Sequence, residues 1–407
     1  MASINVKRWS TVLAGALGCA AGAGVVSSYV FGMFVKAIAA EYDWGRSEAT
    51  LSITCFYIAS GIGSVVLGSI LSRRPLRTVT AVFVALFAAL IATVALLPSS
   101  IPLFCLIFAL IGFFGAAATP MPYAIAIAGW FDRNRGLALA IAVSGTGISA
   151  IFMSTYANWL MERYGWRGGY VGVGLLVGVV ALTGLLFFFR APPVQQLPND
   201  KAASFGDLYL RDRTFWLIAG PILMISIALT GMITSLAPML TDQGLSMAQA
   251  AGLLGLIGGA SWVSRLTVGL LLDRAHVRWI GAVIFTLIAI GVALIATGNE
   301  TARIAGVILV GLGMGSEADL VTYCVSRYYG PRALARALGA VWVFWAWGAG
   351  IGVLIGSMAY DLTGTYDAAL FMFVVLGITS AAVIARLGGY RFAQAKAPLP
   401  QPMPAAG

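Results

Sequence analysis

The sequence predicts an all-α membrane protein with twelve transmembrane helices in two six-helix, pseudo-symmetric bundles. Of its 407 residues, 60% are hydrophobic and 10% are charged, and the mean hydropathy is +0.92. This composition excludes an ordinary soluble enzyme. Apolar runs of about 20 residues, long enough to cross the hydrocarbon core as helices, recur from end to end. A long polar interruption divides them into six and six.

Each predicted span corresponds to one apolar run. The twelve runs lie near Trp9–Ile38, Ser47–Leu71, Thr78–Leu97, Ile101–Ala128, Leu137–Met161, Gly168–Phe189, Phe215–Leu240, Ser246–Leu272, Trp279–Thr297, Ile304–Val325, Leu334–Met358 and Ala368–Ala385. The first run is long enough to span and is not followed by a small-residue cleavage pattern, so we expect it to remain as a signal anchor.

Most Lys and Arg residues fall in the segments on one side of these spans, which hold both chain ends. Cytoplasmic loops carry the excess of such residues, so both termini should be cytoplasmic. Topology then explains the net charge of +10. A basic balance spread over inner loops favours anionic lipid headgroups as partners and argues against nucleic acid.

The polar interruption also sets the expected domain boundaries. Residues 1–190 should form the first bundle, 191–213 a cytoplasmic linker, 214–390 the second bundle and 391–407 a cytoplasmic tail. The two halves repeat several features in the same order. Asp43, Gly45 and Ser47 before the second span, for example, are similar to Asp242, Gly244 and Ser246 before the eighth. A parallel six-plus-six repeat is typical of secondary transporters, whose substrate site lies between two rocking halves.

The segment Gly269-Leu-Leu-Leu-Asp273-Arg274 resembles the inner-loop signature of the major facilitator superfamily. That resemblance implies the major facilitator fold and an intracellular latch, in which Gly269 permits close helix approach while Asp273 and Arg274 join the spans. The equivalent first-half segment, which begins at Gly68, has Ser72 in the acidic position. We therefore expect the first-half latch to be weaker or differently paired.

Within the superfamily, the chain resembles the bacterial monocarboxylate porter and oxalate/formate exchanger branch. The similar stretches are Ser28-Tyr-Val-Phe-Gly-Met-Phe34, Asp43-Trp-Gly-Arg-Ser47, Trp130-Phe-Asp-Arg-Asn-Arg-Gly-Leu-Ala138, Tyr164-Gly-Trp-Arg167, Phe215-Trp216 and Asp242-Gln-Gly-Leu-Ser246 with Arg265. The Asp-Gly-Gly-Trp signature of the animal members is missing from the first span, as is their mid-span lysine, for which Lys36 lies too near the outer end. The resemblance implies a bacterial inner-membrane location.

Three charges cannot be assigned to a loop or to a span end: Arg265, Glu317 and Asp319. A charge at bilayer depth costs about 2.5–3.5 kcal/mol even on the lenient insertion scale and usually marks function. Arg265 lies eight residues, about 12 Å, before Asp273 and so near the midplane. Its guanidinium fork matches a carboxylate. The resemblance implies that it contacts the substrate carboxylate; a bridge to Glu317 or Asp319 is the alternative.

Glu317 and Asp319 are predicted to couple transport to protons. Two residues apart on a helix correspond to about 200° of rotation, so both cannot face one cavity. Glu317 matches the tenth-span position that contacts substrate in the resembled exchangers, so we assign it to the cavity. A carboxylate in a low-dielectric site suits a proton carrier unless it is permanently ion-paired. Either acid could take the proton.

The remaining expected substrate contacts are aromatic. Trp345 matches the place where the exchangers carry a second cation. The loss of that charge favours a substrate with one carboxylate and an apolar or aromatic body. Tyr29 and Phe31 in the first span, and Tyr123 in the fourth, are further candidates. Pro120 and Pro122 precede Tyr123 and should distort that helix, as in the broken helices of transporters.

These observations predict a secondary transporter that takes up an organic monocarboxylate with a proton by alternating access. A proton-antiport exporter of drugs or metabolites, or an anion exchanger, would use the same acids. We expect a functional monomer that binds no cofactor or metal and is not an enzyme. The four cysteines and the single histidine, His276, lack metal-site spacing, and no nucleotide-binding loop is present.

Overall fold

The computed structural model describes residues 2–71, 74–131, 135–190, 211–272 and 275–391, and every regular element in them is a helix. The predicted all-α class is confirmed. Eleven helices among the described residues are long and apolar enough to cross a membrane. One of them, Ile141–Phe188, covers two predicted spans. The chain turns between these spans at Gly165, whose φ of 65° ends one helix and starts the next.

The first half of the chain contains two interrupted spans. Its elements are α1 (Ala2–Ala20), α2 (Ala23–Val25), the π-turn η1 (Val26–Val30), α3 (Phe31–Tyr42), α4 (Arg46–Leu71), α5 (Leu76–Thr93), η2 (Val94–Leu96), α6 (Ile101–Gly115), η3 (Ala116–Ala118), α7 (Pro120–Trp130), α8 (Arg135–Thr183) and η4 (Gly184–Phe188). The first span breaks between α1 and α2, and the fourth between η3 and α7. The two breaks lie side by side: a Cβ atom added at Gly22 would be only 3.0 Å from the Ala118 carbonyl oxygen.

The second half has longer helices. Its elements are α10 (Arg213–Asp242), α11 (Met247–Leu272), α12 (Val277–Ala296), α13 (Glu300–Thr363) and α14 (Asp367–Ile384). Like α8, the element α13 contains two candidate spans, Glu300–Tyr329 and Ala337–Thr363. Side-chain caps fix several starts: Asp212 accepts from the Thr214 N–H, and Asn299 accepts from the Thr301 and Ala302 N–H groups.

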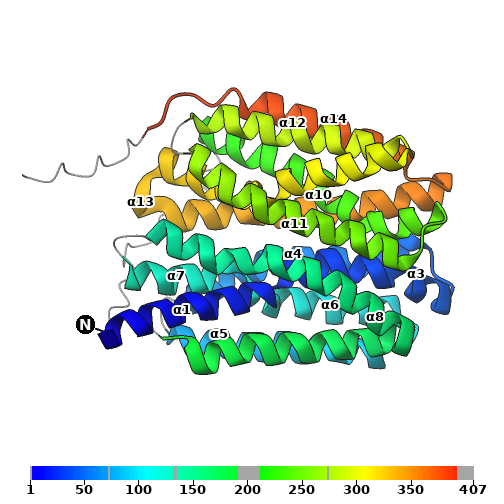
Figure 1. Ribbon diagram of the computed structural model, residues 1–407, viewed down its shortest axis with the longest axis horizontal. Helices are drawn as coiled ribbons and strands as arrows, with labels where there is room; N and C mark the ends of the chain where they lie inside the picture. Colours follow the sequence, from blue (N-terminus) through cyan, green and yellow to red (C-terminus); the bar gives the residue numbers. More distant parts are fainter. Residues whose placement is uncertain (1, 72–73, 132–134, 191–210, 273–274, 392–407) are drawn as a thin grey trace, which may run out of the picture.

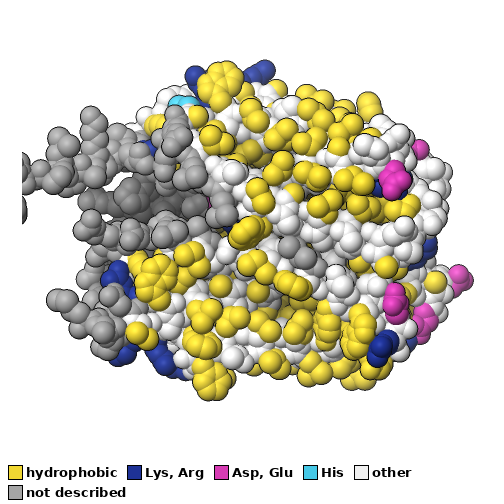
Figure 2. Space-filling model, viewed as in Figure 1, with side chains coloured by type: hydrophobic (Ala, Val, Ile, Leu, Met, Phe, Trp, Pro, Cys, Tyr) yellow, Lys and Arg dark blue, Asp and Glu magenta, His cyan; other side chains and the backbone are white. Residues whose placement is uncertain are grey.

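The helices run along the long axis of the molecule, and the N-terminus lies at one end of it (Figure 1). Hydrophobic side chains cover much of the visible surface, while Lys, Arg, Asp and Glu gather toward the ends (Figure 2). Large apolar residues such as Leu175 and Val179 are mostly exposed. In a bilayer such residues face lipid, because the surrounding hydrocarbon is as apolar as these side chains.

The two halves meet mainly along three pairs of helices: α4 with α13, α8 with α11, and α3 with α10. The last two pairs approach closely at glycines. A side chain at Gly32 of α3 would collide with the Thr234 carbonyl of α10, and Gly147 of α8 packs against Trp262 of α11. Close backbone approach of this kind is how small residues serve membrane helix interfaces. The expected domain boundaries stay a prediction.

Candidate functional site

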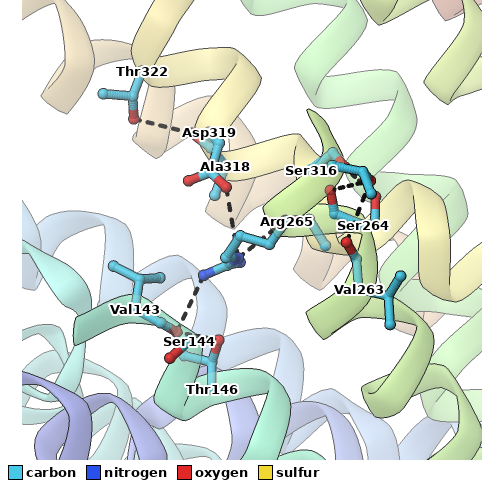
Figure 3. A network of polar contacts seen from close by, with 12 residues as sticks. Val143, Ser144, Thr146, Val263, Ser264, Arg265, Ser316, Ala318, Asp319 and Thr322 are labelled. Atoms are coloured by element: carbon cyan, nitrogen blue, oxygen red, sulfur yellow. Dashed lines mark hydrogen bonds and ion pairs between the residues drawn. The ribbon is translucent and has the colours of Figure 1, made fainter. Parts of the chain in front are cut away.

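Arg265 lies on α11 where this helix faces both α13 and the first half. Its Nε donates to the Gly315 carbonyl of α13 at 3.1 Å, and its Nη1 donates to the Val143 carbonyl of α8 at 3.2 Å. The approach of α13 requires glycine at 315, because any side chain there would overlap with the Ser261 carbonyl. Figure 3 shows the guanidinium between the two halves. Backbone carbonyls from both halves therefore hold it in place.

Asp319 is the partner of Arg265, but the pair is loose. The carboxylate Oδ2 lies 3.6 Å from the Arg265 Nε, and the side chains are 35% and 10% exposed, respectively. This distance exceeds the 2.7–2.9 Å of a charge-assisted hydrogen bond. Nη2 has no hydrogen-bond partner among the described residues. Arg265 thus retains donors for a further anion.

Glu317 has a different environment from Asp319, as their helical spacing predicts. Its side chain is 4% exposed, and within the described part of the chain no cation pairs with it. The Trp345 side chain donates a hydrogen bond to the carboxyl group, while Oε1 has no partner among the described residues. Burying a carboxylate without a cation costs free energy unless the group is neutral. Glu317 is suited to hold a proton.

A cluster of hydroxyls and rings faces these acids from the first half. The Tyr29 hydroxyl donates to the Met314 sulfur at 3.3 Å, which links the π-turn η1 to α13. The Tyr57 hydroxyl of α4 donates to Ser27 Oγ at 3.0 Å, and the Tyr57 ring lies edge-on to Trp345 with centroids 6.2 Å apart. π-Turns occur frequently at functional sites. Two residues expected from the sequence thus contact the opposite half, Tyr29 at Met314 and Trp345 at Tyr57.

Sequence reasoning missed Tyr57 and the two serines of η1. Ser28 Oγ lies 3.3 Å from the Tyr57 hydroxyl, and both serines are buried. The available signal was the Ser27-Ser28 pair inside an apolar run, since a hydroxyl at bilayer depth needs a partner.

Phe31 and Tyr123 lie away from this cluster. Phe31 packs edge-on against Phe108 with centroids 5.7 Å apart. Tyr123 is buried beside Phe189, and its hydroxyl would overlap with any side chain at Gly18. Both positions favour helix packing within the first half, so direct substrate contact by these two residues stays a prediction.

The predicted inner latch is described only in part. Gly269 lies in α11, three residues before the helix ends at Leu272. Asp273 and Arg274 lie outside the described residues, so the latch stays a prediction. No group of three or more His, Cys, Asp or Glu side chains that could hold a metal was found within the described ranges.

A second interface network closes the end of the molecule remote from the N-terminus, and we call it the distal lock (Lys36, Arg46, Asp242 and Asp361). Asp242 of α10 binds Lys36 Nζ at 2.6 Å and the Arg46 guanidinium at 2.6 Å. Asp361 of α13 accepts the Arg46 N–H at 2.9 Å and the Ser47 N–H at 2.7 Å. The second half thus caps the α4 helix of the first.

Aromatic and hydroxyl groups reinforce the lock. The Arg46 guanidinium lies 3.5 Å from the Tyr360 ring centroid and donates to the Tyr366 hydroxyl at 2.6 Å. One turn deeper, Thr50 and Ser357 share a hydrogen bond across the same interface. Lys36 belongs to this lock rather than to the Arg265 site, as its expected place near a span end predicts.

Comparisons with known proteins agree with this fold. The family model described as Major Facilitator Superfamily matches residues 16–353. The uncharacterized MFS-type transporter YcxA of Bacillus subtilis is 24% identical over 356 residues, 83% of this chain and 85% of that protein. Monocarboxylate transporter 13 of Rattus norvegicus is 26% identical over 389 residues, 91% of this chain and 85% of that protein. The crystal structure of the nucleoside transporter NupG superimposes with a TM-score of 0.71 at 14% identity, covering 93% and 98% of the two chains.

Proposed function

Since the chain belongs to the Major Facilitator Superfamily and is an integral membrane transporter, we propose that it takes up an organic monocarboxylate with a proton by alternating access. The vertebrate monocarboxylate transporters among its relatives support the substrate class, at low identity.

The incomplete pairing of Arg265 carries the proposal. Two backbone carbonyls fix the guanidinium, Asp319 holds it only at 3.6 Å, and Nη2 remains unpaired within the described residues. A substrate carboxylate fits this vacancy with two parallel N–H···O bonds, a geometry that lysine cannot offer. Asp319 would then be displaced, so it acts as an internal competitor that returns when the substrate leaves.

Glu317 is the better candidate for the proton. It is buried without a cation, whereas the charge of Asp319 is offset by Arg265. Carrying a monoanion into a cell with a negative interior costs about 2.3 kcal/mol per 100 mV, and one proton cancels that cost. One proton taken up by Glu317 with each monoanion bound to Arg265 leaves the net charge of the site unchanged by loading.

Tyr29, Tyr57 and Trp345 favour a substrate with an apolar or aromatic body, because rings bury and stack against such groups. The buried serines of η1 add hydroxyls that suit a substituent bearing a hydrogen-bonding atom. Phe31 and Tyr123 remain further predicted contacts from the first half. A dicarboxylate would need a second cation, which Trp345 does not supply.

The closed distal lock supports the proposal of an outward-closed state for this conformation. We place the lock on the outer face of a bacterial inner membrane and both termini in the cytoplasm, in agreement with the charge bias of the loops. Residues 1–190 and 214–390 would rock against each other, joined by the 191–213 linker and followed by the 391–407 tail. The latch of Gly269, Asp273 and Arg274 would close the inner face of a monomer.

Uptake into proteoliposomes of a panel of aliphatic and aromatic monocarboxylates, with and without an imposed pH gradient, tests the proposal. We expect saturable uptake that the gradient accelerates, and its loss in Arg265→Gln. Arg77→Gln is the matched control, because Arg77 also binds two backbone carbonyls, at 3.2 and 2.6 Å, but lies on α5. Unchanged uptake by Arg265→Gln would remove the carboxylate clamp. Counterflow of lipophilic cations instead would indicate an exporter, and gradient-independent counterflow an anion exchanger.

A further inference from the structure

A groove on the lipid-facing side of α8 is separate from the Arg265 site. It is a cavity of about 470 Å³ between the two spans of this helix, with Met153 and Leu176 from opposite walls. Phe152 and Trp159 form its rim and are 68% and 42% exposed. Phe152 lies nine residues, about 14 Å, beyond Val143 along the helix. The groove therefore opens toward hydrocarbon and away from the substrate path.

Aromatic rings give the groove a defined end. The Tyr156 hydroxyl donates to the Gly172 carbonyl at 3.4 Å, which ties the two walls together. The Tyr156 and Trp159 rings stack with centroids 6.1 Å apart and planes 17° apart. Trp and Tyr side chains collect at the level of lipid headgroups, where one edge is apolar and the other is wet.

Arg163 places a positive charge at this end. Its guanidinium lies 5.0 Å from the Trp159 ring centroid, and it forms no ion pair with any described residue. It lies four residues, about 6 Å, beyond Trp159 toward the end of the span. An apolar slot that runs into the bilayer beneath an unpaired cation has the shape and charge of one lipid: a chain below and a phosphate above.

We propose that this groove is a binding site for an anionic phospholipid. The phosphate binds Arg163, and one acyl chain lies along Trp159, Tyr156 and Phe152 over Met153. A second copy of the chain, whose exposed Glu162 would face the Arg163 charge, is the alternative that the test below separates. The site is independent of the transported substrate.

Quenching of tryptophan fluorescence by brominated lipids tests the site. The Trp159 signal is the difference between wild type and Trp159→Phe in vesicles that contain a low fraction of brominated phosphatidylglycerol or brominated phosphatidylcholine. We expect Trp159 to be quenched with about five-fold preference for phosphatidylglycerol, the scale of attraction of one basic residue for an anionic surface. Arg163→Gln should lower that preference to near one.

Trp279 supplies the matched control. It is also exposed, and the Arg278 guanidinium lies 5.0 Å from its ring, but it does not line the groove. We expect bromine on the acyl chain to quench Trp159 at a lower lipid fraction than Trp279. Equal quenching of both by either lipid would indicate ordinary surrounding lipid and overturn the proposal. Protection of Trp159 from both lipids would indicate a second copy over the groove and would also overturn it.

Discussion

The distal lock and the Arg265 site join the same two halves, but the polar groups of the lock are fully paired and those of the Arg265 site are not. In the lock, Asp242 binds two cations at 2.6 Å and Asp361 accepts two backbone N–H groups. At the centre, the Arg265 and Asp319 side chains are 3.6 Å apart, and one Glu317 oxygen has no partner among the residues that the structure describes. The lock is complete without a ligand, whereas the centre is not.

This difference separates two tasks. A saturated network stabilises one conformation and has nothing to offer a substrate, because each donor already has its acceptor. A buried polar group without a hydrogen-bond partner destabilises the empty state, and a ligand that supplies the partner binds more favourably for that reason. The lock is therefore suited to hold one conformation closed, whereas the centre is suited to bind a ligand.

The largest effect should follow Arg265→Lys, which keeps the charge but removes the fork. We expect uptake of monocarboxylate at low concentration to fall roughly 100-fold, because two parallel N–H···O bonds and the carbonyl contacts to Val143 and Gly315 are lost. Initial rates in proteoliposomes over a range of substrate concentrations measure it. A loss of less than two-fold would show that a point charge suffices.

Asp319→Asn is the opposite test of the same pair. Without its charged competitor, Arg265 should bind the carboxylate more tightly, so the apparent KM should fall while the maximal rate falls with slower release. The expected change in KM is about three- to ten-fold, since exposed and partly exposed ion pairs contribute about 1 kcal/mol. A raised KM would mean that Asp319 orients Arg265 instead of competing with the substrate.

Glu317→Gln should uncouple transport from the proton. The amide mimics the protonated acid in shape and keeps a group for Trp345, so counterflow of labelled substrate should persist near the wild-type rate. Uptake driven by a pH gradient should fall about ten-fold, because the proton no longer offsets the anion. A pH electrode outside the vesicles records the missing proton flux. Asp319→Asn, with proton flux retained, is the control that separates the two acids.

Asp242→Asn should weaken the lock and leave the centre intact. The amide cannot neutralise Lys36 and Arg46, which then repel each other at the interface. A cysteine placed at Thr50, behind the lock, should react several-fold faster with an impermeant maleimide from the outer side. Asp367→Asn, an acid in the first turn of α14, is the control. Equal labelling in both variants would show that the lock does not govern closure.

The sequence was sufficient for those features that depend on one segment at a time. The lengths of the apolar runs predicted the helices, and the position of Arg265 along the eighth run predicts a place deep in the membrane. It was harder to predict from the sequence which residues pair across helices. The sequence offered Asp319 or Glu317 as partners of Arg265, and the close approach at Gly315 decides for Asp319. Nothing local to Arg46 indicates that Asp361, more than 300 residues later, caps its helix.

The aromatic candidates show the same limit. Both Tyr29 and Phe31 were candidates, but residues two apart in a regular helix point different ways, so spacing alone could not tell which of them faces the site. In the structure the Tyr29 hydroxyl contacts the Met314 sulfur, whereas the Phe31 ring packs against Phe108. The π-turn that brings Ser27 to Tyr57 shifts the helical phase by part of a turn, and no periodicity count anticipates such a shift.

The smallest predicted effect concerns a third carboxylate, Asp212, which is saturated like the lock but lies wholly within the second half. It caps α10 and accepts hydrogen bonds from Arg391 at 2.8 and 3.0 Å and from the Tyr329 hydroxyl at 2.8 Å. Burial raises the pKa of Asp212, but the hydrogen bonds from Arg391, the Thr214 N–H and Tyr329 outweigh it and lower the pKa to about 2.

Because the folded pKa of Asp212 lies below the unfolded value of about 4, its stabilisation is present above pH 4 and is lost as the pH falls toward 2. Asp212→Asn should therefore lower the free energy of unfolding by about 1 kcal/mol at pH 7, the usual range for a hydrogen-bonded surface pair. Thermal unfolding in detergent at pH 7 and at low pH measures the difference, which should vanish near pH 2. Labelling behind the lock should not change, because both partners of this pair move with the same half. Faster labelling in Asp212→Asn would mean that fold stability and closure of the lock are coupled.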